Sequence, residues 1–253
     1  MRKEALKYTE YTAYPCHLSR LEWIYDTVEK YRKPGVPVKI LDVGAGTGNV
    51  TIPLGTIPDS EVLGIDIHQP TLDLAVAANT LPNVSFRFEY LQDCPLNGFQ
   101  FIILTEVLEH IAGYDEILRY LGQSMDADAQ LLITVPNGYG PFEIAMQPLY
   151  LMRRWGLNNF ILKVKRLLGK KEPYSQNYET PHVNFFTVSR LGKELNRLGL
   201  RIIEVKKAYL FAPIIETYLP FIPLKAIAKL DQALVSILPK GFASGFYFRI
   251  VRK

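Results

Sequence analysis

The sequence predicts a doubly wound α/β fold, in which helices cover both faces of a mostly parallel sheet. From residue 38 onward, short apolar segments alternate with segments of helical periodicity, a pattern typical of parallel sheets. The first apolar segment runs directly into a glycine-rich turn and then a helical segment. The chain has 253 residues, of which 48% are apolar and 21% are charged. These values suit one large α/β domain.

The predicted elements follow one another in a regular order. Apolar runs predict five strands before residue 136, at Val38–Val43, Glu61–Ile67, Val84–Tyr90, Phe99–Thr105 and Gln130–Val135. Helical spacing predicts three helices in the same region, at Asn49–Ile57, Pro70–Asn79 and Glu106–Gly122. The pattern then stops for about 45 residues. It resumes with a helix at Thr187–Leu198 and with strands at Leu200–Lys206 and Phe246–Arg252, which a proline-interrupted connector with helical content joins.

The cysteines and the apolar segments indicate the compartment. Cys16 and Cys94 form no CxxC pair and lie near no histidine cluster, so neither a disulfide framework nor a metal site is expected. The N-terminus lacks the unbroken apolar stretch of a signal peptide. Prolines and charged residues interrupt the most apolar region, Tyr209–Leu238, so a spanning helix is not expected there. We therefore expect a cytoplasmic protein.

A glycine-rich turn follows the first predicted strand. Gly44, Gly46 and Gly48 leave room for a ligand to approach the backbone without a Cβ in the way. A dinucleotide fingerprint would place a third Gly or Ala at position 49, which is Asn49 here, so pyrophosphate binding is the weaker interpretation. Asp66 ends the second predicted strand, where its carboxylate could accept hydrogen bonds from both hydroxyls of an adenosyl ribose. Both NAD and S-adenosylmethionine contain this ribose.

Four motifs together resemble a known family. LDVGAGTGNV, VLGIDI, FIILTEVLEHI and LLITVPN resemble the class I S-adenosylmethionine-dependent methyltransferases, in particular the small-molecule group that includes the ubiquinone-type O-methyltransferases. The resemblance covers about residues 36–137. It implies S-adenosylmethionine as cofactor and a Rossmann-like sheet of seven strands, the last one antiparallel and inserted beside the fifth. Leu200–Lys206 and Phe246–Arg252 are the expected sixth and seventh strands.

The resemblance also implies a set of cofactor contacts. Asp42 and the loop of Gly44, Ala45, Gly46 and Gly48 would hold the methionine end of the cofactor. Asp66 would bind the ribose, and Ile67 would pack on the adenine. The family usually has an acidic residue where this chain has Tyr90, so Tyr90, the backbone of Leu91 and the carboxylate of Asp93 are the candidate adenine contacts. Thr105 and Glu106 would lie beside the methyl group.

Two histidines are candidate general bases. Methyl transfer is an in-line displacement in which positioning can supply most of the catalysis, and a neutral histidine is the usual base for a hydroxyl acceptor. His110 follows Glu106 by four residues on the expected helix, although it could instead bond to nearby backbone. His182 lies in a segment, HVNFFT, that resembles one bordering the acceptor pocket in this family; a structural role at the helix entrance is its alternative. Glu106 and Glu109 are expected at a solvated helix start rather than as an acid–base pair, and His17 is expected at the surface.

The segment after the fifth predicted strand is strongly basic. Between Ile144 and Lys171 there are seven basic and no acidic residues, interleaved with apolar ones as in an amphipathic helix pair. This composition suits an anionic membrane surface, with residues 149–171 in contact with it on the inner face of the membrane. A cap over the acceptor pocket with a solvated basic face is an equal alternative. Nucleic acid is a weaker one, because the segment is rich in aliphatic residues and the rest of the chain is net acidic.

These observations predict a single methyltransferase domain that transfers a methyl group to a small-molecule or lipid-linked acceptor, with oxygen as the expected atom. The expected regions are an N-terminal helical lid (1–35), a cofactor-binding core (36–137), a variable basic insert or acceptor cap (138–186), and the rest of the sheet with its helical connector (187–253). Two alternatives stay open, an NAD(P)-dependent oxidoreductase and a non-catalytic adaptor that binds the cofactor.

Overall fold

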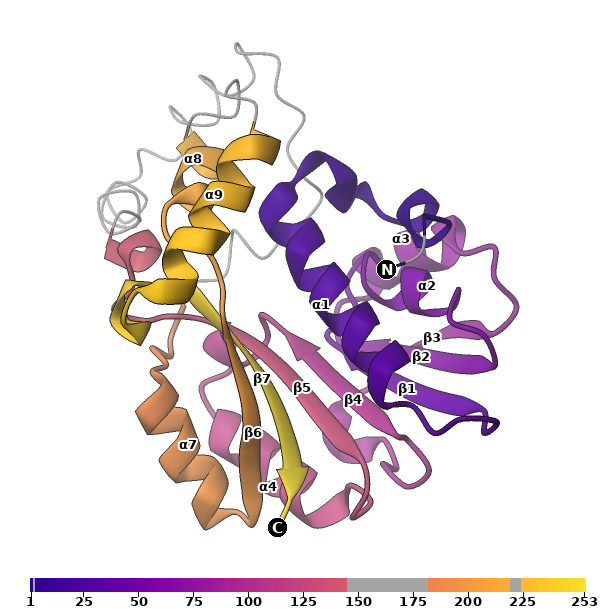
Figure 1. Ribbon diagram of the computed structural model, residues 1–253. Coiled ribbons are helices and arrows are strands. Elements are labelled where there is room, and N and C mark those ends of the chain that lie inside the picture. Colours follow the sequence, from indigo (N-terminus) through magenta and orange to yellow (C-terminus); the bar gives the residue numbers. More distant parts are fainter. Residues whose placement is uncertain (2, 145–181, 219–223) are drawn as a thin grey trace.

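Seven strands form one mixed sheet at the centre of the protein (Figure 1). The computed structural model describes residues 1, 3–144, 182–218 and 224–253. The strand order is β3-β2-β1-β4-β5-β7-β6, and β7 runs antiparallel to both of its neighbours. The predicted topology is therefore confirmed. The strands are β1 (Val38–Val43), β2 (Ser60–Asp66), β3 (Val84–Phe88), β4 (Phe101–Thr105), β5 (Gln130–Pro136), β6 (Leu200–Lys207) and β7 (Gly245–Arg252).

Helices cover both faces of the sheet, as predicted. One face packs on α1 (Pro15–Tyr31) and α2 (Thr51–Leu54), and the other on α4 (Tyr114–Ser124) and α7 (Val188–Arg197). The alternation along β1 shows why: Ile40 belongs to the core under α1, and its neighbour Leu41 belongs to the core under α4. A strand that is buried on both sides is rich in apolar residues on both faces, as Val38, Ile40 and Leu41 are here, whereas Lys39 near the start of the strand is exposed.

The remaining helices lie around the edges of this sandwich. The helix α3 (Gln69–Ala78) packs beside β3. The helices α8 (Ala212–Tyr218) and α9 (Leu224–Ile237) precede β7, and both contact α1 (Figure 1). Short 3₁₀ turns occur at Ala5–Tyr8, Glu10–Ala13, Leu91–Asp93, Leu108–His110 and Lys240–Phe242. Across the described ranges, no helix combines the length and the apolar character needed to span a bilayer.

The predicted helix over Glu106–Gly122 is wrong at its start. Glu106 has a left-handed backbone with φ of 54°, and the helix α4 begins only at Tyr114. The reason is tertiary. The carbonyls of Leu108 and Ile111 accept hydrogen bonds from the side chain of Asn184 at 2.8 and 2.7 Å, so they do not serve a helix. The result is an irregular loop between β4 and α4. It is called the 105–111 loop here, counted from the last residue of β4.

The predicted helix after the glycine-rich turn and the basic segment after β5 have different outcomes. The predicted helix over Asn49–Ile57 is shorter in the structure, because residues 49 and 50 belong to the turn that precedes α2. The basic segment after β5 lies almost entirely in residues 145–181, outside the described part of the chain. Its amphipathic character therefore stays a prediction, and so does the division of the chain into four regions.

Candidate functional site

The glycine loop after β1 adopts a conformation that requires its glycines. Gly44, Gly46 and Gly48 all have positive φ, at 74°, 54° and 79°. A Cβ at Gly44 would lie 2.6 Å from Cγ2 of Val107, and one at Gly48 would lie 3.0 Å from the side chains of Ile52 and Phe86. A Cβ at Gly46 would meet nothing within 4 Å. Gly44 and Gly48 thus serve packing, whereas Gly46 faces open space.

Asp66 ties the end of β2 to this loop. Its Oδ2 accepts a hydrogen bond from the backbone N–H of Gly46 at 2.8 Å, and its Oδ1 accepts one from the N–H of His68 at 2.9 Å. Each oxygen of a carboxylate has a second lone pair, so Asp66 retains acceptor sites for a ligand. The next residue, Ile67, is 57% exposed. Its apolar side chain is available to cover a ligand bound at Asp66.

Asp42 is buried near the end of β1, and one of its carboxylate oxygens has no hydrogen-bond partner among the described residues. Its Oδ2 accepts a hydrogen bond from the hydroxyl of Thr51 at 2.6 Å, whereas its Oδ1 has no partner among the described residues. Burial, and to a smaller extent the charge of Asp66, raise the pKa of Asp42 to about 7. A buried acceptor without a donor is costly, and a ligand cation or N–H at this point would remove the cost.

Arg20, which the sequence analysis did not single out, enters the site from α1. Its Nη1 lies 3.0 Å from Oε1 of Glu106, and that oxygen also accepts the hydroxyl of Thr134 at 2.8 Å. The Nε of Arg20 is buried and has no partner among the described residues. Arg20, Asp42 and Glu106 all act electrostatically on the buried hydroxyl of Tyr11. The unpaired donor of Arg20 and the unpaired acceptor of Asp42 thus belong to residues whose charges both act on Tyr11.

The segment before α1 is docked on the glycine loop. Oδ1 of Asn49 lies 2.8 Å from the backbone N–H of Glu10 and 3.1 Å from the hydroxyl of Thr9. His17, which was expected at the surface, is half-buried, and its Nδ1 lies 2.8 Å from Nη2 of Arg20. Burial and the charge of Arg20 lower the pKa of His17 to about 3, so it stays neutral.

The three candidate adenine contacts lie after β3, next to Asp66. The backbone N–H of Glu89 donates to the carbonyl of Asp66 at 3.2 Å, which joins the end of β3 to the end of β2. Tyr90 is 54% exposed and Asp93 is exposed, whereas Leu91 is buried in the core under α4. Tyr90 and Asp93 thus have side chains free of the core.

A second cluster of titratable side chains combines residues of the 105–111 loop with His182, from the segment after the basic insert. The rings of His110 and His182 meet edge to face with centroids 5.0 Å apart. The ring nitrogens of the two histidines and a carboxylate oxygen of Glu109 lie within 4.8 Å of one another. This donor set suits proton transfer, and its spacing would also accept a divalent cation. The sequence predicted both histidines separately, and the structure brings them together.

Two carboxylates of this cluster were not expected there. Glu109 lies fully buried, and neither carboxylate oxygen has a hydrogen-bond partner among the described residues, so the expected solvated position is wrong. Burial, and next the charge of Glu106, raise the pKa of Glu109 well above its usual range. Glu143, which no motif indicated, places its Oε1 2.9 Å from Nδ1 of His182.

Backbone contacts hold the two halves of the cluster together. The carbonyl of Glu109 accepts hydrogen bonds from the N–H groups of Val183 and Asn184, at 2.8 and 3.2 Å. The side chain of Asn184 binds the same loop, as described above. The segment that follows the basic insert is therefore fixed against the loop that follows β4, which carries both Glu106 and His110.

Comparison with protein-family models decides the family. A model described as a methyltransferase domain matches residues 17–205, which is most of the chain. The protein belongs to this methyltransferase family. The matched region is a class I S-adenosylmethionine-dependent methyltransferase domain, and the seven-stranded topology is the fold of that class. The interpretation as an NAD(P)-dependent oxidoreductase is thereby wrong, and the expected cofactor is confirmed.

Curated relatives of this methyltransferase are ubiquinone biosynthesis O-methyltransferases. The chain is 32% identical over 117 residues to the mitochondrial enzyme of Bos taurus. This alignment covers 42% of this chain and 31% of the bovine protein. The alignment thus spans about a third of the length of that relative. The chain is also 23% identical over 190 residues to the enzyme of Rickettsia canadensis, covering 74% of this chain and 72% of the relative.

Solved structures share the fold of the methyltransferase. A sarcosine dimethylglycine methyltransferase from Galdieria sulphuraria superposes with a TM-score of 0.59 at 12% identity, covering 92% of this chain and 84% of the other. The magnesium protoporphyrin IX methyltransferase of Synechocystis, solved with bound S-adenosylhomocysteine, superposes with a TM-score of 0.55 at 14% identity, covering 94% of this chain and 84% of the other. At these identities the likeness concerns the fold.

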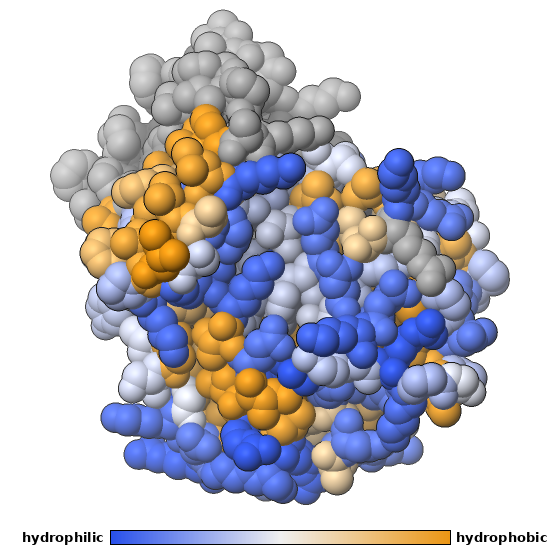
Figure 2. Space-filling view, in the orientation of Figure 1, coloured by the Kyte–Doolittle hydropathy of each residue, from blue (hydrophilic) through white to orange (hydrophobic). Residues whose placement is uncertain are grey.

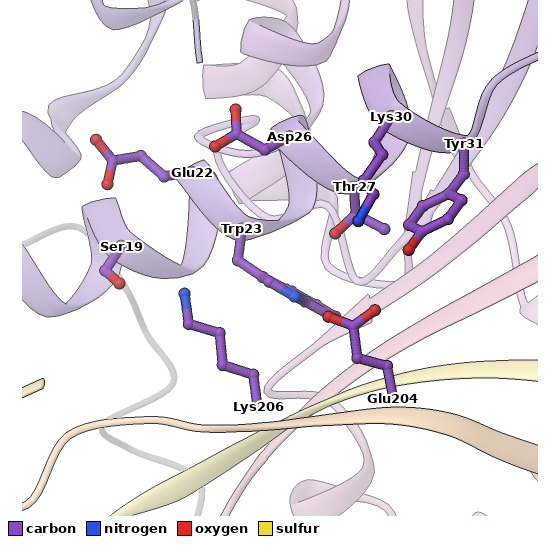
Figure 3. Close-up of a pocket in the computed structure, with 9 residues that line it drawn as sticks. All are labelled: Ser19, Glu22, Trp23, Asp26, Thr27, Lys30, Tyr31, Glu204 and Lys206. Carbon is purple, nitrogen blue, oxygen red and sulfur yellow. The ribbon is translucent and has the colours of Figure 1, made fainter. Parts of the chain in front are cut away.

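A separate cleft of about 220 Å³ lies between α1 and β6 of the methyltransferase (Figure 3). Its lining mixes charges of both signs around the ring of Trp23, with Glu22 and Asp26 on α1 and Glu204 and Lys206 on β6. None of the predicted cofactor or catalytic residues lines it. The cleft is therefore distinct from the site at the glycine loop.

Proposed function

We propose that the protein transfers the methyl group of S-adenosylmethionine to a hydroxyl oxygen of a small or lipid-linked acceptor. The observation that carries this proposal is the 105–111 loop, which joins two sets of residues. Glu106 at its start contacts Arg20 beside the glycine loop, and His110 near its end contacts His182. A cofactor held on the first side would direct its methyl group toward an acceptor on the second.

The unpaired atoms of the site match the chemistry of the cofactor. The methionine end of S-adenosylmethionine carries an ammonium and a carboxylate. In the proposed pose Oδ1 of Asp42 accepts from the ammonium and Nε of Arg20 donates to the carboxylate, and both atoms lack partners in the described part of the chain. Asp66 binds the ribose hydroxyls. Ile67, Tyr90, the backbone of Leu91, and Asp93 surround the adenine.

The first 35 residues form a lid over this pose. Thr9 and Glu10 contact Asn49 directly after the glycine loop, and Arg20 from the same region contacts Glu106. A lid that touches both ends of the site would exclude water from the sulfonium. Exclusion of water strengthens the electrostatic interactions inside and prevents side reactions.

The reaction needs one proton acceptor. The bond between the methyl carbon and sulfur breaks as the bond between that carbon and the acceptor oxygen forms, which leaves S-adenosylhomocysteine. The hydroxyl proton passes to a neutral imidazole, with His182 as the proposed base and His110 packed against it. A positioned base of this kind contributes about 10²- to 10⁴-fold to the rate.

Two measurements test this function. Isothermal titration with S-adenosylmethionine, S-adenosylhomocysteine and NADH should show binding of the first two alone. Incubation with methyl-labelled S-adenosylmethionine and extracts of lipids and metabolites should then yield a labelled product whose new bond is a methyl ether. A labelled amine or carbon product would contradict the assignment of oxygen, and absence of any labelled product would contradict the catalytic proposal.

Asp66→Ala is expected to weaken binding of S-adenosylmethionine by about 1.5–3 kcal/mol, the value of hydrogen bonds to a charged acceptor. The fold should persist, because the carboxylate lies at the carboxyl end of β2 and outside the core. Titration calorimetry measures the change, with Asp115→Ala on the exposed side of α4 as the control. Unchanged affinity in Asp66→Ala would show that the ribose binds elsewhere.

The proposed acceptor class and the basic segment suggest that the protein works at an anionic membrane surface. Several described residues of the C-terminal region are also apolar and exposed. On α9 and the turn after it, Leu230, Leu234, Ile237 and Phe242 are 64%, 44%, 80% and 51% exposed. Figure 2 shows hydrophobic side chains gathered over α8 and α9. Exposed apolar groups near lysines and arginines favour lipid contact. A cap over the acceptor pocket is the competing role of residues 149–171.

Binding to vesicles that contain phosphatidylglycerol or phosphatidylserine is expected to be strong at low salt and weak at high salt. The screening length falls from about 10 Å at 0.1 M to about 3 Å at 1 M, so the attraction of Lys and Arg is lost. Changing five basic residues to Gln should abolish co-sedimentation and leave S-adenosylmethionine affinity intact; they are Arg153, Arg154, Lys163, Lys165 and Arg166. Vesicle binding that does not depend on lipid charge or on salt would contradict membrane docking and favour the role of residues 149–171 as a cap over the acceptor pocket.

A further inference from the structure

The contact between His182 and Glu143 has the form of an orienting pair. Oε1 of Glu143 lies 2.9 Å from Nδ1 of His182. The side chain of Glu143 is 1% exposed and that of His182 is 16% exposed, so the carboxylate lies inside and the imidazole reaches the site. An ionised carboxylate only accepts hydrogen bonds, so Nδ1 must carry the proton of this contact. In a neutral imidazole the lone pair is then on Nε2.

The burial of Glu143 is costly for the fold alone. Its second oxygen, Oε2, is buried and has no partner in the described ranges. A half-satisfied buried carboxylate destabilises a protein relative to a well-packed apolar side chain. Glu143 lies seven residues after the end of β5, whereas His182 begins the described segment after the insert, so no local motif requires the contact. Among the described residues, the imidazole of His182 is the group that binds the carboxylate of Glu143.

The side chains around His182 show which of them can orient its ring. His110 packs on the ring with centroids 5.0 Å apart, and Glu109 belongs to the same cluster. Neither oxygen of Glu109 has a hydrogen-bond partner among the described residues, whereas Oε1 of Glu143 lies within hydrogen-bond distance of the imidazole, so Glu143 is the carboxylate that contacts His182 directly. A carboxylate at Nδ1 fixes the orientation and tautomer of the ring, and it stabilises the imidazolium that forms when Nε2 takes a proton.

The geometry points to Glu143 as a positioning residue for methyl transfer, which holds His182 with Nε2 directed at the acceptor hydroxyl. This inference rests on the proposed function. In the step it supports, the hydroxyl proton passes to Nε2 as the oxygen takes the methyl group from sulfur. The positive charge lost from the sulfonium appears on the imidazolium, beside the negative charge of Glu143. Glu143 itself forms no bond to substrate or cofactor.

A double-mutant cycle with turnover of the labelled methyl group tests this role. Glu143→Gln keeps the shape and removes the charge, and it is expected to lower kcat about 10- to 100-fold with KM for the acceptor and affinity for S-adenosylmethionine within twofold of the parent. In a His182→Ala background the same change should have no further effect, because a residue that acts through His182 cannot act without it. Glu143→Asp should recover part of the lost rate.

The control is Glu194→Gln on α7. Glu194 is a second partly buried carboxylate with one unpaired oxygen in the described part of the chain, but it binds Tyr114 and Arg190 instead of a histidine. Its replacement should leave kcat unchanged. An equal loss from Glu143→Gln in the parent and in the His182→Ala background would overturn the proposal. So would equal losses from the Glu143 and Glu194 replacements, or activity that a chelator abolishes and a divalent cation restores.

A spectroscopic measurement separates this inference from the proposed function. ¹⁵N NMR of labelled histidine should show His182 as the Nδ1–H tautomer in the parent and as a tautomer mixture in Glu143→Gln, with or without an acceptor. If the parent binds S-adenosylmethionine but methylates nothing, the proposed function fails and the tautomer still reports on Glu143. If the tautomer is the same in both proteins, the positioning role is wrong whatever the activity.

Discussion

Gly46→Val is expected to abolish measurable binding of S-adenosylmethionine while the protein stays folded. A Cβ at Gly46 would meet no atom within 4 Å, so the cost of the substitution in the unliganded protein is the backbone strain at its φ of 54° rather than a clash of the Cβ. In the proposed pose the cofactor occupies the open space at Gly46, beside Asp66, whose carboxylate the N–H of Gly46 binds at 2.8 Å. Titration calorimetry should show at least a 100-fold loss of affinity, with thermal unfolding as the check on folding.

Gly35→Val is the matched control for backbone strain. Gly35 has φ of 69°, and a Cβ there would also meet nothing within 4 Å. It lies in the connection from α1 to β1, at the amino end of that strand and away from the glycine loop. Both substitutions carry the left-handed penalty of about 1–2 kcal/mol, and only Gly46→Val should block the cofactor. Equal affinities for the two variants would place the cofactor elsewhere.

The parts of the site that could be predicted from sequence are those that local signals encode. Gly44, Gly46 and Gly48 are predictable because a turn with three positive φ values tolerates little else. Asp66 is predictable because it ends a strand next to that turn. The apolar runs predict the strands for the same local reason. The antiparallel β7 followed from the family resemblance, since strand direction is not encoded in an apolar run.

The parts that could not be predicted depend on contacts between distant segments. The 105–111 loop looks helical in sequence, but Asn184, more than 70 residues later, binds its carbonyls. Arg20 reaches Glu106 across 86 positions of the chain, and Glu143 reaches His182 across an insert. No periodicity or motif marks these pairs. In the sequence, Glu106 and Arg20 appear only as charged residues, one directly after a β strand and one on the first helix. Such residues are too common for the sequence alone to mark them as partners.

Asp42 is expected to contribute a loss of stability to the unliganded protein as the pH rises from about 4 to about 7, opposite in sign to the gain from His17, whose pKa is lowered to about 3. Burial raises the pKa of Asp42 from 3.8 to about 7, so between these values the folded protein binds a proton that the unfolded chain has released. The contribution of Asp42 to the free energy of unfolding therefore falls with pH in this window, by on the order of 4 kcal/mol. The contribution is complete below pH 4 and absent above about pH 7.

Asp42→Asn isolates this contribution. Urea unfolding across pH 4 to 8 should show the free energy of unfolding of the variant rising relative to that of the parent as the pH rises, because His17 contributes equally to both proteins. Thr51→Val removes the hydroxyl that stabilises the ionised form, and should extend the contribution of Asp42 to higher pH. Identical pH profiles for the parent and Asp42→Asn would show that the carboxylate titrates normally.

The cofactor should reverse the effect of pH at this residue. If the ammonium of S-adenosylmethionine occupies Oδ1 of Asp42, it favours the ionised carboxylate, so binding at pH 6 releases a proton and affinity rises as the pH approaches 7. Calorimetry in two buffers of different ionisation enthalpy measures the released proton directly. Asp42→Asn should bind the cofactor weakly and without proton release. Proton release that persists in the variant would assign it to another group and remove Asp42 from the methionine site.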